Sequence, residues 1–86
     1  MVDPSPLEFP IVFPLKVIGH NADDFEVFVA SIVKAHAPLS AQTTVTRLSQ
    51  NGKYLAVTVT FVAESRAQLD AIYQALNDSG RVLMAL

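Results

Sequence analysis

Apolar residues alternate with polar ones in several short stretches and recur with helical spacing in two others. A period of two predicts strands at 11–19, 42–50 and 54–61, and a short apolar run predicts a last strand at 81–86. Between them lie two helical patterns, one ended by Pro38 and one ended by Gly80. The first has apolar residues at i, i+3, i+4, i+7 and i+8, namely Phe25, Phe28, Val29, Ile32 and Val33.

The predicted order of elements is β-α-β-β-α-β. Right-handed crossovers place both helices on one face of an antiparallel sheet and leave a gap that another strand fills. The pattern therefore predicts an α+β fold, the ferredoxin-like sandwich, with a four-stranded sheet in the order 4-1-3-2. Residues 1–10 contain three prolines and are predicted as an extended N-terminal arm, and residues 11–86 as a single ferredoxin-like domain.

Local signals refine the ends of these elements. Asn21 is expected to cap the first helix, and Ser65 with Gln68 is expected to form a capping box on the second. Pro14 lacks an N–H, so regular pairing of the first strand is expected to begin near it.

The Asn51-Gly52 pair predicts a two-residue type I′ hairpin. That register would place Leu48 opposite Leu55 and Val45 opposite Thr58.

Composition narrows the classes of function. The 86-residue chain is 51% apolar and 16% charged, so its apolar residues must either fill a core or cover a contact surface, and a homodimer is one expectation. The formal net charge of −2 makes nucleic acid an unlikely partner by attraction. No signal segment or membrane helix is apparent, so we expect a cytoplasmic location and no membrane contact.

No catalytic constellation emerges from the reactive side chains, and we expect no enzyme activity, metal or cofactor. His20 and His36 flank a predicted helix and are too far apart to share a metal. Asp23 and Asp24 are adjacent in its first turn, where the helix dipole explains them better than a carboxylate dyad. The chain lacks cysteine and a glycine-rich phosphate loop.

The stretch NGKYLAVTVTF, residues 51–61, poses the question of RNA binding. An RNA-recognition motif stacks bases on aromatic residues of its central strands. Only Tyr54 would lie on the open face of this sheet, because Phe61 has the opposite parity. RNA binding is therefore kept only as a lesser alternative.

The loop after the first strand is a candidate ligand site, formed by Gly19, His20, Asn21 and Asp23. Backbone N–H groups at a helix N-terminus can receive a carboxylate or a phosphate. The competing interpretation is a plain glycine turn followed by an asparagine cap.

Five segments resemble the YbeD-like family of small bacterial proteins of unknown function. They are LEFPIVFPLKVIG (7–19), HAP (36–38), GKYLAVTVT (52–60), IYQAL (72–76) and VLMAL (82–86). The resemblance implies an ACT-like regulatory domain that dimerises and binds amino acids, with Gly19 matching the glycine that ends the first strand of such domains. It also implies a link to lipoate metabolism.

These patterns favour a regulatory or adaptor domain that acts through contact with a protein partner whose identity the sequence does not give. The alternatives are an amino-acid sensor and an RNA-binding module. Predicted contact residues lie in the arm and on the open sheet face, namely Glu8, Phe9, Pro10, Ile18, Val45, Tyr54 and Thr58.

Overall fold

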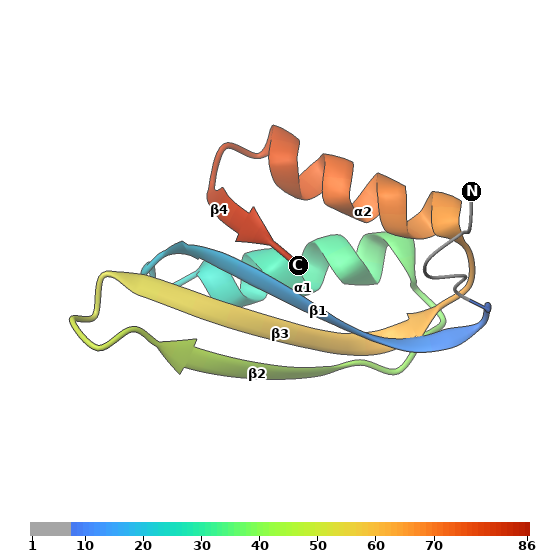
Figure 1. Cartoon of the computed structure of the whole chain (residues 1–86), viewed down its shortest axis with the longest axis horizontal. Coiled ribbons are helices and arrows are strands. Elements are labelled where there is room, and N and C mark those ends of the chain that lie inside the picture. The colour runs from blue at the N-terminus through green and yellow to red at the C-terminus, as the bar shows by residue number, and fades with distance from the viewer. Residues whose placement is uncertain (1–7) are drawn as a thin grey trace, which may run out of the picture.

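The computed structural model describes residues 8–86, which form one antiparallel sheet and two helices (Figure 1). The sheet order is β2-β3-β1-β4, which confirms the predicted 4-1-3-2 order read from its other edge. In Figure 1, α1 passes behind the ribbon of β1, and α2 lies beside the short β4. The elements are β1 (Ile11–His20), α1 (Phe25–His36), β2 (Thr43–Leu48), β3 (Tyr54–Ala63), α2 (Arg66–Asp78) and β4 (Val82–Ala85).

The hydrophobic core lies between the helices and one face of the sheet. Every second residue of β1 and β3 points into it, as the period of two predicts, and the helices contribute the buried stripes expected from their spacing. Its fully buried larger members are Leu15, Val17, Val57, Val59 and Phe61 from the sheet, and Phe25, Val29, Val33, Ile72 and Leu76 from the helices. The opposite face of the sheet carries no helix.

The start of α1 differs from the prediction. The helix begins at Phe25, and Asn21 does not cap it. Instead, the Asn21 side chain donates to the Gly52 carbonyl at 3.1 Å, and its backbone N–H donates to the Lys53 carbonyl at 2.8 Å. The predicted cap is wrong because the β2–β3 hairpin, distant in sequence, offers these two acceptors to Asn21.

The register of the hairpin is as predicted, with Leu48 opposite Leu55 and Val45 opposite Thr58. Its turn is not the predicted type I′, because Gly52 has φ 76° while Asn51 has no positive φ. The Gly52 N–H closes the turn on the Ser49 carbonyl at 2.9 Å.

The capping of α2 confirms one half of the predicted capping box, because the return bond of Gln68 reaches the residue before Ser65. The Ser65 hydroxyl accepts from the Gln68 N–H at 3.1 Å, and the Gln68 side-chain oxygen accepts from the Glu64 N–H at 2.7 Å. The Gln68 amide also donates to the His36 carbonyl at 2.9 Å. One side chain thus joins the start of α2 to the end of α1.

Pairing of β1 with β3 begins at Ile11, three residues before the predicted point near Pro14. The backbone of Lys16 bonds to Leu86 beyond β4, so the nitrogen of Pro14, two residues earlier, also points away from β3. The missing N–H therefore costs β3 no hydrogen bond.

The predicted arm, residues 1–10, lies outside the described residues except for Glu8, Phe9 and Pro10. Phe9 is half-buried against the core, whereas Glu8 and Pro10 are exposed. Within residues 8–86, neither helix has the length and apolarity needed to cross a bilayer.

Candidate interaction surface

The uncovered side of the sheet, called here the open face, is built from cross-strand rows. The strand register aligns residues across it, and of the three rows that follow, two run from one sheet edge to the other and the last joins only β3 and β1. The rows are Val45–Thr58–Lys16–Leu86, then Arg47–Ala56–Ile18–Met84, then Tyr54–His20.

Four predicted contact residues, Ile18, Val45, Tyr54 and Thr58, gather on this one face. Phe9 instead packs against the core and lies apart from them. The structure thus brings together the sheet part of the predicted surface. The contact roles of all seven residues stay predictions.

Large apolar side chains on the open face are exposed to solvent. Val45 is 67% exposed, Met84 51% and Leu86 60%. Val12, further along β1 on the same face, is 65% exposed. Met84 and Leu86 are neighbours at one sheet edge, and Val45 lies on the other edge strand with β3 and β1 between. Several exposed large apolar residues on one face of a small domain are typical of an interaction site.

A shallow depression of about 490 Å³ lies within the open face. Apolar atoms of Ile18, Ala56 and Tyr54 line it together with the charged residues Lys16 and Arg47. Such a depression combines apolar surface with two cations and can receive an apolar group that carries a negative charge beside it.

Two rings meet at one end of the open face. The centroids of the Tyr54 and His20 rings are 5.5 Å apart, with an angle of 36° between their planes. The backbone N–H of Tyr54 donates to the Ser49 hydroxyl at 2.9 Å, which ties the first residue of β3 to the hairpin loop. The sequence missed this pair because it placed His20 in a loop, whereas His20 is the last residue of β1.

Charge is distributed unevenly between the sheet and the rest of the molecule. None of the four strands contains an aspartate or glutamate, and their Lys and Arg residues, Lys16 and Arg47, both lie exposed on the open face. Every acidic residue between residues 8 and 86 lies outside the strands, so the strands carry a positive charge although the net charge of the chain is −2.

The predicted ligand residues after β1 face different surroundings. A Cβ on Gly19 would lie 2.5 Å from Cζ of the Phe25 ring and 2.7 Å from the Arg81 carbonyl oxygen. Gly19 thus lets α1 and the α2–β4 loop approach β1. His20 contacts Tyr54, Asn21 bonds to the hairpin, and Asp23 is exposed. Their ligand role stays a prediction.

The carboxylate beside this loop has its own partner. Asp24 accepts two hydrogen bonds from the Arg81 guanidinium, at 2.7 and 3.2 Å. These bonds lower the pKa of Asp24 below its usual range and raise the pKa of Arg81. The same guanidinium lies 4.6 Å from the centroid of the Phe28 ring.

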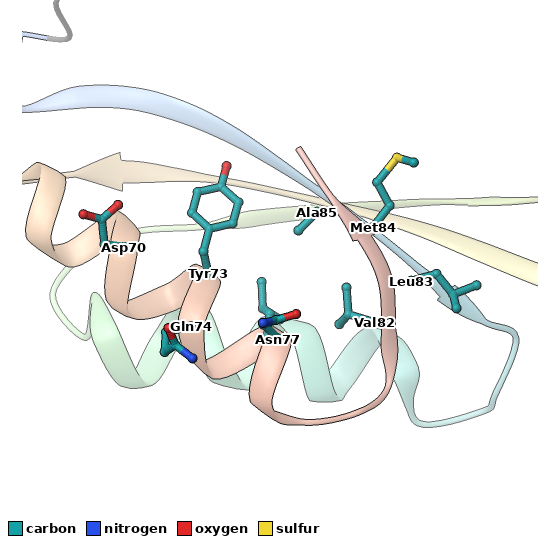
Figure 2. A pocket seen from close by; sticks show the side chains of 9 residues that line it. Asp70, Tyr73, Gln74, Asn77, Val82, Leu83, Met84 and Ala85 are labelled. Atoms are coloured by element: carbon teal, nitrogen blue, oxygen red, sulfur yellow. The ribbon is translucent and has the colours of Figure 1, made fainter.

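A second depression, of about 480 Å³, lies between α2 and β4 (Figure 2). Tyr73 and Asp70 border it from the helix, and Val82 and Ala85 border it from the strand. Partial burial raises the pKa of the Tyr73 hydroxyl. The sequence missed this depression because it forms only where two elements, each predicted as core, pack side by side.

Comparison with known proteins places the chain among uncharacterised bacterial proteins. It is 46% identical to a UPF0250 protein of Nitrosomonas europaea, over 100% of both chains. It is 44% identical to a UPF0250 protein of Chromobacterium violaceum, over 92% of this chain and 90% of that one.

A solved structure supports the fold alone. The solution structure of protein HP0495 from H. pylori superposes with a TM-score of 0.77, at 14% identity, over 98% of this chain and 89% of that one.

The family described as "Protein of unknown function (DUF493)" matches residues 4–86, which is nearly the whole chain. This match and the identities to UPF0250 proteins confirm the YbeD-like resemblance. The chain therefore belongs to this family of small bacterial proteins.

Proposed function

We propose that the chain is a small regulatory or adaptor domain that acts through protein contact, with the open face as its contact surface. The observation that carries this proposal is the exposure of Val45, Met84 and Leu86 on a sheet face that no helix covers. Burial of such side chains stabilises a complex by about 25 cal/mol per Å² of apolar surface before the costs of association.

The position of this surface on the scaffold supports the proposal. Rigid strands present its side chains in fixed rows, and the core lies directly behind them. A surface held this way loses little conformational entropy when it binds. A cytoplasmic location for the complex is part of the proposal. Amino-acid sensing, RNA binding and a link to lipoate metabolism stay predictions.

Site-specific photo-crosslinking tests the proposal. A benzophenone amino acid replaces Val45 on the open face or, in the matched control, Val27 on α1. The two valines are equally accessible, at 67% and 70% exposure. After irradiation of bacterial cells that express the full chain, we expect a discrete protein adduct from position 45 that is absent from position 27.

A second pair of variants tests whether the adduct depends on apolar contact with the open face. Met84→Gln on the open face should weaken the position-45 adduct, whereas Leu39→Gln, at a loop position 99% exposed, should leave it unchanged. Adducts of equal yield from positions 45 and 27, or none from either, would reject the open face as the contact surface.

A further inference from the structure

We propose that the open face docks an acidic, apolar segment of another protein, whose carboxylates pair with Lys16 and Arg47. This inference rests on the proposed function and names the chemistry of its partner. It follows from the absence of acidic residues in the strands, which leaves a surface with apolar side chains and cations together. Surfaces of complementary charge steer encounter and select partners.

The two cations are available to a partner. Lys16 and Arg47 are exposed, and within the described part of the chain neither forms an ion pair with a carboxylate. Within residues 8–86 the strands contribute no acidic side chain, and Asp24 is already held by Arg81. A carboxylate from outside would therefore compete with no acidic side chain of the strands.

The spacing of the cations suits an extended segment. Arg47 and Lys16 lie two strands apart and are offset by two residues, so their Cα atoms are about 12 Å apart at ordinary sheet spacings. In an extended chain, carboxylates four residues apart span about 13 Å. An apolar side chain between them would reach the depression lined by Ile18 and Ala56.

Two other occupants fit less well. A second copy placed face to face would bring Lys16 and Arg47 close to their own counterparts, which disfavours the contact. Nucleic acid would gain only two strand cations and the Tyr54–His20 rings, and its phosphates would leave Val45 and Met84 unmatched.

Titration of the isotope-labelled full chain with a defined peptide tests the chemistry of the face. The probe has about twelve residues, with Glu at every fourth position, Val or Leu two residues after each Glu, and Ser or Thr elsewhere, so that Glu and the apolar residues share one face of the extended peptide. A matched probe has Lys in place of Glu. We expect the acidic probe to shift the amides of Lys16, Ile18, Arg47 and Ala56. Added salt should weaken its binding, and the basic probe should leave these amides unmoved.

Two double charge-reversal variants, matched in net charge, test whether the acidic probe binds through Lys16 and Arg47. Lys16→Glu with Arg47→Glu should weaken binding of the acidic probe by about tenfold or more, because two attractions become two repulsions. Lys34→Glu with Arg66→Glu makes the same change in net charge at exposed helix positions and should change binding less than about twofold. Unchanged thermal unfolding shows that both double variants are folded.

The crosslinking experiment is repeated with the same charge-reversal variants, and the yield of the position-45 adduct is measured. Loss of the position-45 adduct in Lys16→Glu/Arg47→Glu, but not in the helix control, supports an acidic partner. An adduct that persists after this reversal overturns the inference and leaves the proposed function standing. If the chain without charge reversal forms no adduct at position 45, the proposed function itself is rejected.

Three further outcomes would overturn or replace the acidic-partner inference. Amides on the open face that ignore the acidic probe, or respond equally to both probes, overturn the inference. A polyuridylate oligonucleotide that shifts them more than the peptide does, with an adduct lost after nuclease, replaces it with RNA binding. Self-association that protects the same amides replaces it with a second copy.

Discussion

At the scale of single residues, Gly19 shows how tightly the start of α1 is packed onto the sheet. Its missing side chain leaves room for the ring of Phe25 on one side and the Arg81 carbonyl on the other. A glycine predicted as a ligand contact thus has a packing role that explains its presence. The sequence could not reveal this role, because neither neighbour is near Gly19 along the chain.

Gly19→Ala should destabilise the fold. The added Cβ would lie 2.5 Å from a ring carbon and 2.7 Å from a backbone oxygen, and only the ring can move away. We expect a loss of about 1–3 kcal/mol in the free energy of unfolding, the usual cost of overpacking a core. Urea denaturation measures it.

Phe25→Leu in the Gly19→Ala background serves as the control. The smaller side chain should relieve part of the strain. The double variant should therefore lose less unfolding free energy than the sum of the losses in the two single variants. A Gly19→Ala variant as stable as the parent chain would show that α1 accommodates the methyl group freely.

At the scale of elements, the Asp24–Arg81 pair joins the start of α1 to the loop before β4. The pKa of Asp24 is lowered in the folded protein, so its ionised form favours folding. That contribution is fully present above the unfolded pKa, near 3.9. It is lost as the pH falls through the lowered, folded pKa.

Asp24→Asn should therefore lower the stability at pH 7, and its difference from the parent chain should shrink below about pH 4. Thermal unfolding across this pH range measures the difference. Asp23→Asn, which removes the adjacent exposed carboxylate, is the control and should have a smaller effect. A deficit in Asp24→Asn that is independent of pH would assign its cause to packing.

The elements themselves could be predicted from the sequence, but their tertiary adjustments could not. Periodicity located both helices and gave the faces of the sheet, because burial on one side imposes it. The cap at Asn21 and the turn at Asn51 were wrong for different reasons. The Asn51 side chain accepts from the Ser49 hydroxyl and the Lys53 N–H, which are bonds within the loop itself. Asn21 bonds to the hairpin, and such long-range hydrogen bonds compete with local capping without leaving a local pattern.

At the scale of the whole molecule, the open face combines apolar attraction with electrostatic repulsion toward a second copy. We expect the isolated chain to self-associate more strongly at about 0.5 M salt than at about 0.02 M, because salt screens Lys16 and Arg47 but leaves Val45 and Met84 unaffected. Sedimentation equilibrium measures this. It also tests the predicted homodimer.

Lys16→Gln with Arg47→Gln should remove the salt dependence, since only apolar contacts remain on the face. The strongest association at the lowest salt would contradict this expectation. It would indicate that the sheet of one copy binds the acidic helices of another, an arrangement that does not close on itself.

The division of charge between the two layers gives the molecule an electric dipole across its thickness. The strands form its positive end, and the helices and loops, which hold every acidic residue between residues 8 and 86, form its negative end. In the field of an acidic partner, the domain would rotate before contact so that the sheet approaches first. A chain with an overall charge of −2 can thus be attracted to a negative surface by its orientation alone.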